Sequence, residues 1–313
     1  MKKALVYPGQ GSQFVGMGKE IFDSFQVARD IFAEIDDALN EKLSKLIFEG
    51  PIEDLTLTQN TQPALMAVSI AIQKVIEKES GKQIADLCSY VAGHSLGEYS
   101  ALCAAGSISI ADTARLLRIR GNAMIQAVPA GQGGMAALLG VDFEKAAEIA
   151  KFASSEGACQ AANDNGGGQV VISGVMAAID KAVASASQFG VKRAVKLPVS
   201  APFHSTLMQP AAIAMQEALA EVKVYAPKVP LIANVTAQEV LNPDEIRDLL
   251  VKQVTGMVRW RESVTELKNK GVGRIIEIGA GKVLSGLVKR IEAEVETVSI
   301  QTPADVESFL NSL

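Results

Sequence analysis

Residues 89–103 have the sequence SYVAGHSLGEYSALC, and this stretch decides the fold. Its centre, Gly93 to Gly97, matches the pattern G-x-S-x-G. A strand-like segment, Ser89 to Ala92, precedes the pattern, and a helix-like segment, Glu98 to Cys103, follows it. A serine at such a strand–turn–helix junction is held in a strained backbone position, with its hydroxyl exposed at the end of a sheet. We therefore predict that Ser95 is a nucleophile.

The same turn favours acyl transfer. The helix after Ser95 would direct the positive end of its dipole toward the serine, and the backbone N–H of Leu96 could donate to an oxyanion. Five-residue patterns also arise by chance, so the prediction depends on the strand before the turn and the helix after it.

Strand patterns alternate with helical patterns along most of the chain. The strand-like segments lie at residues 4–7, 89–92, 231–235, 274–278 and 297–300. This alternation predicts an α/β fold in which helices cover a mostly parallel sheet.

The middle of the chain has a different order of elements. Its strand-like segments lie at residues 134–139, 159–162, 169–173 and 191–197, and its helix-like segments at 143–154 and 175–188. The order β-α-β-β-α-β is that of a ferredoxin-like unit. We predict a small ferredoxin-like domain at residues 129–198, inserted into a large α/β domain that residues 1–128 and 199–313 form. Ligands of such proteins often bind in the cleft between domains.

A serine hydroxyl needs a base, usually a histidine, and the chain has only two. His94 is next to the nucleophile within the turn, so we expect it to pack in the elbow. His204 lies in a loop of prolines and small residues, before a helix-like segment at residues 206–220. Loops that a rigid scaffold positions often carry catalytic groups. We therefore predict that His204 is the base.

The helix-like segment at residues 112–126 carries a charge on its apolar side. Leu117, Arg120 and Met124 recur at helical spacing, so Arg120 belongs to the apolar stripe. A buried guanidinium is costly unless it meets a carboxylate. The pattern alone leaves two partners open, namely an acidic side chain of this chain or the carboxylate of a ligand.

Composition limits the class of protein. The chain has 313 residues, of which 48% are hydrophobic, and a net charge of -5, which favours a globular protein without a nucleic-acid or membrane-surface partner. No apolar run reaches the roughly 18 residues that cross a bilayer, and the apolar start at residues 4–7 is too short for a signal peptide. Three cysteines without metal-type spacing fit a reducing compartment, so we expect a cytoplasmic protein with no metal site.

Two glycine-rich segments fail the tests for nucleotide-binding loops. A G-x-G-x-x-G pattern from Gly9 would require glycine at Phe14, and a P-loop ending in Gly281-Lys282 would require glycine at Ile276. The glycines on both sides of Gln10 could instead present its backbone N–H toward the site.

Several segments resemble the malonyl-CoA:acyl carrier protein transacylases of fatty acid synthesis. They are PGQGSQ at residues 8–13, GHSLGE at 93–98 and PVSAPFH at 198–204, with further similarity in QVVISG at 169–174 and GAGKVL at 279–284. The resemblance implies a hydrolase-like large domain and a ferredoxin-like small one. It also implies transfer of a malonyl group from malonyl-CoA to the phosphopantetheine thiol of acyl carrier protein, through a malonyl-serine in a ping-pong reaction without a cofactor. The residues leave open whether the pathway makes fatty acids or polyketides.

The resemblance also implies roles for single residues. The backbone amides of Gln10 and Leu96 would form the oxyanion hole. Arg120 would bind the free carboxylate of the malonyl group through a bidentate fork, a geometry suited to guanidinium. A carbonyl near Gln253 would orient His204, in place of the carboxylate of a catalytic triad.

Three further positions match substrate-binding residues of the family. Asn163 and Asn165 do so in a loop, residues 163–169, where this chain has glycines and the family more often has serine and proline; they could equally be ordinary turn residues. Phe203 resembles the malonyl-selective form of the family and should crowd an α-methyl branch on the acyl group.

Two other functions stay open at this point. A serine hydrolase would release the acyl group to water. Arg120, and the lack of an evident acidic residue as third member of a catalytic triad, argue against it. A non-catalytic docking module of a biosynthetic assembly would not need Ser95 and His204. Because carrier proteins are acidic, basic residues are candidate docking charges or ordinary solvated residues. They are Lys192, Arg193, Lys196, Lys252, Arg259 and Arg261.

Overall fold

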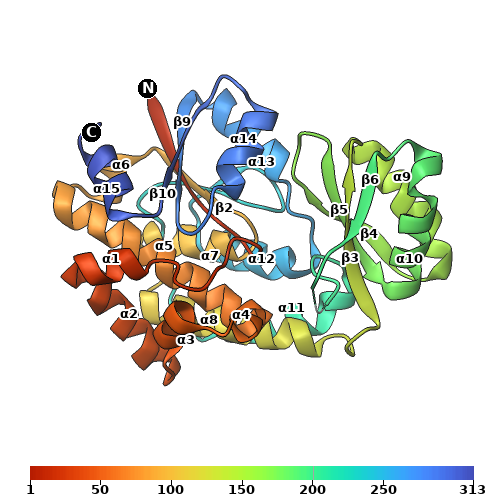
Figure 1. The fold of residues 1–313 in the computed structure, drawn as a ribbon, viewed down its shortest axis with the longest axis horizontal. Coiled ribbons are helices and arrows are strands. Elements are labelled where there is room, and N and C mark those ends of the chain that lie inside the picture. The colour runs from red at the N-terminus through yellow and green to blue at the C-terminus, as the bar shows by residue number, and fades with distance from the viewer. Residues whose placement is uncertain (200) are drawn as a thin grey trace.

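The computed structural model describes residues 1–199 and 201–313; Ser200, within the segment at 198–204, lies outside the described residues. Two sheets organise the fold, and Figure 1 shows the smaller one with its helices at one end of the molecule. The strands of the larger sheet are β1 (Lys2–Tyr7), β2 (Tyr90–Gly93), β7 (Leu231–Ile232), β8 (Glu239–Val240), β9 (Val272–Ile278) and β10 (Glu296–Ile300).

Helices surround this sheet. Before and after β2 they are α1 (Lys19–Ser24), α2 (Gln26–Leu39), α3 (Leu43–Glu49), α4 (Ile52–Thr56), α5 (Thr58–Ser80), α6 (Ile84–Leu87), α7 (Leu96–Ala104) and α8 (Ile110–Gln126). Later in the chain they are α11 (Gln209–Ala220), α12 (Pro243–Thr255), α13 (Trp260–Asn269), α14 (Val283–Ile291) and α15 (Pro303–Leu310), with a 3-10 turn η3 (Thr206–Met208) before α11.

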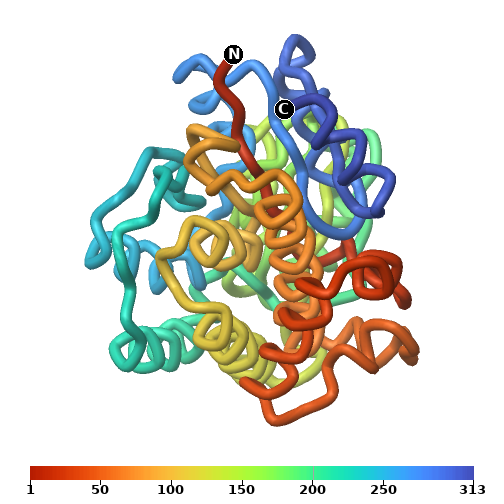
Figure 2. The backbone as a smooth tube through the Cα atoms, turned by 90° about the vertical axis from the view of Figure 1, so that its left-hand side faces the viewer, coloured from red at the N-terminus to blue at the C-terminus, as the bar shows by residue number. Residues whose placement is uncertain are grey.

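The larger sheet has the strand order β10-β9-β1-β2-β7-β8. All its neighbours are parallel except β7 and β8. The central strand β1 is fully buried from Ala4 to Tyr7, as expected for a strand with helices on both faces. The two ends of the chain meet here, because β1 pairs with β9, and both termini lie close together in Figure 2. The predicted α/β fold with a mostly parallel sheet is confirmed.

The smaller sheet comprises β3 (Gly133–Leu139), β4 (Cys159–Asp164), β5 (Gln169–Val175) and β6 (Arg193–Lys196). Its order is β4-β5-β3-β6, and every pair is antiparallel. Helices α9 (Phe143–Ala153) and α10 (Met176–Ser185) share a buried apolar cluster with it, and 3-10 turns η1 (Ser154–Glu156) and η2 (Ala186–Phe189) follow them. This is the predicted ferredoxin-like order. We propose that the inserted domain extends over residues 129–198, with residues 1–128 and 199–313 forming the large domain.

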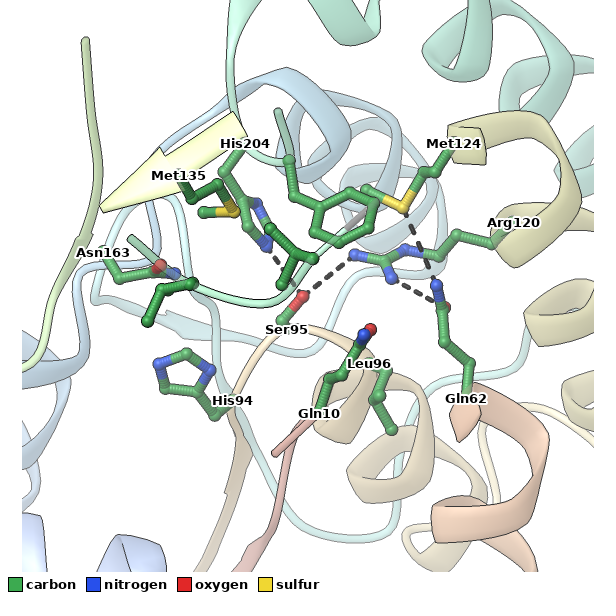
Figure 3. A pocket seen from close by; sticks show the side chains of 13 residues that line it. Gln10, Gln62, His94, Ser95, Leu96, Arg120, Met124, Met135, Asn163 and His204 are labelled. Carbon is green, nitrogen blue, oxygen red and sulfur yellow. Dashed lines mark hydrogen bonds between the residues drawn. The ribbon is translucent and has the colours of Figure 1, made fainter. Parts of the chain in front are cut away.

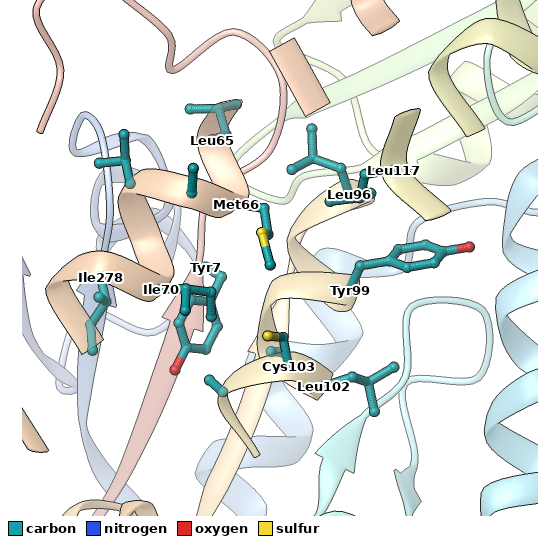
Figure 4. Packing of buried hydrophobic residues seen from close by; sticks show 14 of the residues in the cluster. Tyr7, Leu65, Met66, Ile70, Leu96, Tyr99, Leu102, Cys103, Leu117 and Ile278 are labelled. Atoms are coloured by element: carbon teal, nitrogen blue, oxygen red, sulfur yellow. The ribbon is translucent and has the colours of Figure 1, made fainter. Parts of the chain in front are cut away.

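Helix α5 lies at the centre of the main core. It is buried along most of its length and packs against α2, α7 and α8. Figure 4 shows Met66 and Ile70 of α5 facing Tyr7 of β1 and Leu102 and Cys103 of α7. The core therefore holds β1 and α7 in fixed positions. Helix α7 begins directly after Ser95, and the carbonyl of Tyr7 at the end of β1 accepts from the N–H of His94, the residue before it.

The bounds of most expected elements shift by a few residues in the structure, and two of these shifts have a clear local cause. The strand expected at residues 231–235 ends at Ile232, because the chain turns back there: the N–H of Ala237 donates to the carbonyl of Ala233, and the N–H of Ala233 to that of Gln238. The helix expected at residues 206–220 begins with η3, and α11 starts only at Gln209, one residue before a proline that favours the first helical turn. Among the described residues, no helix combines the length and the apolar character needed to cross a membrane.

Candidate active site

Ser95 lies at the tip of a sharp turn between β2 and α7. Its backbone has φ 55° and ψ -110°, a strained conformation for a residue with a side chain. The side chain of Asn234 holds the turn: its Oδ1 accepts from the N–H of Ser95 at 2.8 Å, and its Nδ2 donates to the carbonyl of Gly93 at 2.7 Å. The strain is thus supported by a partner distant in the sequence.

Glycines on both sides of Ser95 permit this turn. A Cβ at Gly93 would lie 1.9 Å from the carbonyl oxygen of Gly97, and a Cβ at Gly97 would lie 2.2 Å from the carbonyl oxygen of Tyr7. Both distances are far shorter than any contact a side chain can make. The motif therefore has its glycines where the backbone of β1 and of the turn itself comes closest.

His204 meets Ser95 across the site. Its Nε2 lies 2.7 Å from Ser95 Oγ, and its Nδ1 lies 2.9 Å from the carbonyl oxygen of Gln253 and 3.1 Å from that of Gly256. A carbonyl oxygen can only accept, so Nδ1 carries the proton and Nε2 of the neutral ring faces the hydroxyl. Burial, together with the charge of Arg120, lowers the pKa of His204 to about 3. The imidazole is therefore neutral and able to accept a proton at neutral pH.

Arg120 is buried beside the same hydroxyl, with 1% of its surface exposed. Its Nη2 donates to Ser95 Oγ at 3.1 Å and to Gln253 Oε1 at 2.8 Å, and its Nη1 donates to Gln62 Oε1 at 2.7 Å. Its guanidinium also lies 5.5 Å from the ring centre of Tyr99. Among residues 1–199 and 201–313, no carboxylate lies within ion-pair distance of Arg120, and its buried Nε has no partner. Of the two partners that the sequence left open, the internal ion pair is therefore absent from the described part of the chain.

These groups line a cavity of about 110 Å³, which Figure 3 shows with Ser95 between His204 and Arg120. Gln10 and Leu96 lie on the opposite side of Ser95 from His204 in this view. The side chain of Gln10 donates to Thr58 Oγ1 at 3.2 Å. The remaining lining is mostly apolar and consists of Met124, Met135, Leu197, Val199 and Phe203, with Gln62, His94 and Asn163.

His94 points away from the nucleophile's hydroxyl. Its Nε2 lies 2.9 Å from Asn165 Oδ1, and its ring centre lies 5.7 Å from that of Trp260. This agrees with the expected packing role. Asn163 lines the cavity of Ser95, whereas Asn165 lines a neighbouring cavity of about 200 Å³ that His94 and Asn163 also border. The substrate-binding roles of both asparagines stay predictions.

Three of the six candidate docking charges are engaged in ion pairs. Arg261 Nε lies 2.8 Å from the buried carboxylate of Asp164, Arg259 pairs with Glu262, and Lys196 pairs with Asp180. Arg261 therefore has a structural partner, which weakens its case as a docking residue.

Sequence reasoning missed three residues of the site. Gln62 on α5 and Asn234 after β7 have no motif that marks them, although each places a polar side chain in a buried setting. Glu98, one turn after Ser95, is 1% exposed, and its carboxylate accepts from Gln253 Nε2. The sequence carries one sign of this role for Glu98, namely a charged residue among mostly apolar positions of α7.

Comparisons with known proteins agree with this geometry. Residues 4–303 match the family model described as acyl transferase domain. The chain is 45% identical to the malonyl CoA-acyl carrier protein transacylase of Bacillus subtilis, over 100% of this chain and 97% of that protein.

Solved structures are similar over the whole chain. The acyl-carrier-protein-S-malonyltransferase of Bartonella henselae has a TM-score of 0.98 and 56% identity, over 100% of this chain and 99% of that one. A type II PKS acyl-carrier protein in complex with its malonyl-transacylase matches with a TM-score of 0.96 and 39% identity, over 100% of both chains. From its full-length identity and its fold, this chain belongs to the acyl transferase family, among the malonyl CoA-acyl carrier protein transacylases.

Proposed function

We propose that this protein transfers a malonyl group from malonyl-CoA to the phosphopantetheine thiol of an acyl carrier protein, through an ester on Ser95. One observation carries the proposal: Ser95 Oγ lies 2.7 Å from a neutral imidazole and 3.1 Å from a buried guanidinium. The imidazole supplies the base that an acyl transfer needs. The guanidinium, without a carboxylate partner in the described chain, suits an acyl group that ends in one.

In the first half-reaction, Ser95 Oγ attacks the thioester carbonyl of malonyl-CoA while His204 Nε2 takes the hydroxyl proton. A C–O bond forms, the C–S bond breaks, and His204 returns the proton to the sulfur of coenzyme A. The imidazolium that forms in between is stabilised by the carbonyl oxygens of Gln253 and Gly256, which accept from Nδ1.

The second half-reaction follows the same path in reverse. The carrier's phosphopantetheine thiol gives its proton to His204, and its sulfur attacks the ester carbonyl. The C–O bond to Ser95 breaks, and His204 returns the proton to Oγ. No redox step or cofactor is needed, because the overall reaction exchanges one thioester for another: the C–S bond to coenzyme A breaks and a C–S bond to the carrier thiol forms.

The backbone amides of Gln10 and Leu96 are proposed as the oxyanion hole. Leu96 is the first residue of α7, so its N–H belongs to the unpaired amides at the positive end of a helix. One such donor typically contributes about 3 kcal/mol to the transition state.

The malonyl carboxylate is proposed to bind Arg120. The Nε of Arg120 is a buried donor without an acceptor among the described residues, and such a group is costly unless a ligand satisfies it. Nη2 faces Ser95, so a diacid esterified there would have its free end beside the guanidinium. A monoacid would leave this donor unpaired, which gives the site a reason to select malonyl.

Radiolabelled malonyl-CoA should leave one label per chain on the peptide that contains Ser95. The measurement is proteolysis of the quenched protein followed by mass-spectrometric mapping, with the Ser95→Ala variant as the control. Label that is absent, or that persists in the variant, would contradict the covalent route.

The same assay distinguishes a transferase from the rival serine hydrolase. Free malonate should appear slowly without carrier protein, and addition of holo-carrier should divert the label to the carrier thiol. Malonate release at the same rate with and without carrier would favour the hydrolase.

Phe203 is expected to make the site prefer malonyl over methylmalonyl donors. It lines the cavity of Ser95 and is 8% exposed, so an α-methyl branch would meet a side chain that has little room to move. One methyl group in such a pocket changes kcat/KM by about tenfold or more. The ratio of kcat/KM for malonyl-CoA to kcat/KM for methylmalonyl-CoA should fall in Phe203→Ala. An equal ratio in the variant and the parent would contradict a steric role of Phe203.

The proposed partners are malonyl-CoA and an acidic acyl carrier protein, without nucleic acid or membrane. We propose a cytoplasmic location, in keeping with three cysteines that are all free thiols.

A further inference from the structure

A buried hydrogen-bond network lies beneath the nucleophile, and Glu98 is its only acidic member among the described residues. Glu98 is the third residue of α7 and follows Ser95 in the pattern S-x-x-E, which usually forms a capping box with the carboxylate on the serine N–H. The structure gives that N–H to Asn234 Oδ1 instead. The carboxylate of Glu98 is thus available for other donors.

Gln253 connects Glu98 to all three groups of the proposed mechanism. Its Nε2 donates to Glu98 Oε2 and, at 2.9 Å, to the carbonyl oxygen of Ser95. Its Oε1 accepts from Arg120 Nη2 at 2.8 Å, and its backbone carbonyl accepts from His204 Nδ1 at 2.9 Å. The side-chain amide of Gln253 therefore donates from Nε2 to Glu98 and to the carbonyl of Ser95, and it accepts at Oε1 from Arg120. Its orientation decides both sets of contacts.

We propose that Glu98 is a positioning residue that fixes the orientation of the Gln253 amide and, through it, the place of Arg120 in the site. The proposal rests on the proposed function. It assigns to Glu98 the selection of a carboxylate-bearing acyl group, without contact with that group.

Donors and acceptors around Gln253 fix the orientation of its side-chain amide. Above its pKa of about 7, Glu98 is an ionised carboxylate that can only accept, so it requires Nε2 of Gln253 to face it. Oε1 then faces Arg120, whose guanidinium can only donate. If the amide were reversed, its NH₂ would face the guanidinium, and the carbonyl of Ser95 would lose its donor. Glu98 Oε1 is also engaged, accepting from the N–H of Asn234 at 3.2 Å.

A glutamine at position 98 cannot satisfy both contacts. Its single oxygen can accept from Gln253 or from Asn234, and its NH₂ then faces the other donor. The reversed Gln253 amide relieves that conflict only by turning donors toward Arg120. We therefore expect Glu98→Gln to loosen the guanidinium although the side chain keeps its shape.

Charge adds to this effect. Arg120 is buried and contacts no carboxylate in the part of the chain that the structure describes, and Glu98 lies one amide away from it. A negative charge at that remove offsets part of the cost of burying the guanidinium without neutralising it. Burial raises the pKa of Glu98 to about 7, while its bond from Gln253, the backbone N–H of Asn234 and the charge of Arg120 act in the opposite direction.

The test compares acylation of Ser95 by malonyl-CoA and by acetyl-CoA, which lacks the free carboxylate. In Glu98→Gln we expect kcat/KM for malonyl-CoA to fall by about tenfold to one hundredfold, and kcat/KM for acetyl-CoA to fall by much less. A malonyl-to-acetyl ratio that stays at the parent value would overturn the proposal. If the parent protein itself forms no malonyl ester, the proposed function fails, which is a separate outcome.

Glu277→Gln is the matched control. Glu277 is also fully buried and accepts two backbone N–H bonds, from Leu284 at 3.0 Å and Ser285 at 2.7 Å, but it does not line the cavity of Ser95. We expect its substitution to lower stability and to leave the malonyl-to-acetyl ratio unchanged. A similar change of ratio in both variants would show a general loss of packing and contradict the proposal.

A double-mutant cycle tests whether Glu98 acts through Gln253. Gln253→Leu retains the backbone carbonyl that faces His204 but removes the amide, so it should lower the ratio by itself. In that background Glu98→Gln should change the ratio much less than it does in the parent, because only the charge of Glu98 then acts on Arg120. Additive effects would overturn the relay, and an unchanged ratio in the single Gln253→Leu variant would overturn it even if Glu98→Gln fails to fold.

Discussion

Replacement of His204 by alanine is expected to slow formation of the malonyl-enzyme by about one hundredfold to ten thousandfold. The ring is the one group within hydrogen-bond distance of Ser95 Oγ, among the described residues, that can accept its proton; the other neighbour, Arg120, can only donate. Rapid-quench measurement of label on Ser95 reports this step directly.

The second histidine provides the control. His94 bonds Asn165 and packs on Trp260, so His94→Gln should cost much less than the loss of His204. An equal fall in the rate of malonyl-enzyme formation in both variants would contradict the role of His204 as the general base.

The protonation state of His204 can be measured in the same variant. His94→Gln leaves a single histidine, whose ring resonances are then assigned without ambiguity. Because burial and the charge of Arg120 lower the pKa of His204 to about 3, these resonances should not titrate between about pH 8 and pH 5. Stability should fall as the pH decreases below about 6.5, since the unfolded chain binds a proton there and the folded chain does not. A ring that titrates near its ordinary pKa would contradict the buried, neutral base.

The sharp turn at Ser95 could be predicted because its requirements are local. Only glycine fits where Gly93 and Gly97 approach other backbone atoms, so the elbow leaves a pattern in five consecutive residues. The ferredoxin-like unit could be predicted for a similar reason. Its strands and helices are consecutive in the sequence from β3 to β6, so the strand-like and helix-like patterns can be read in order.

The partners that complete the site could not be predicted in this way. Arg120 meets Gln62 and Gln253, which lie 58 and 133 residues away, and Ser95 is held by Asn234, 139 residues away. Each partner is a single amide at the end of an element, and a single amide has no periodicity. The apolar stripe of α8 predicted that a charge is buried, but it could not show that neutral amides surround it.

The short strand β7 shows the same limit. Its apolar pattern continues to Val235, and the pattern alone therefore favoured a longer strand. The chain turns after Ile232, where the backbone of Ala233 bonds Ala237 and Gln238. The turn places Asn234 against the elbow, and that contact depends on β2 being beside β7. Local propensity gave way to a tertiary contact.

Arg120→Met is expected to remove much of the preference for malonyl-CoA over acetyl-CoA. Methionine fills much of the same space but removes the charge, so a malonyl carboxylate would be buried beside Ser95 without a partner. Truncation of one partner in a buried, hydrogen-bonded charge pair costs about 2–5 kcal/mol, which corresponds to a loss of roughly thirtyfold to several thousandfold in kcat/KM for malonyl-CoA. Acetyl-CoA has no carboxylate to lose, so its kcat/KM should change little, and single-turnover labelling with both donors measures the ratio.

Two variants separate this effect from general damage. Arg118→Met lies two residues away on α8 and breaks an ion pair with Glu41, but Arg118 does not line the cavity, so the ratio of the two donors should stay at the parent value. Arg120→Lys keeps the charge and loses the planar fork, so it should retain only part of the malonyl preference. If Arg120→Met lowered kcat/KM for malonyl-CoA and for acetyl-CoA by the same factor, the guanidinium would act on Ser95 alone. The assignment of malonyl as the preferred acyl group would then have to be given up.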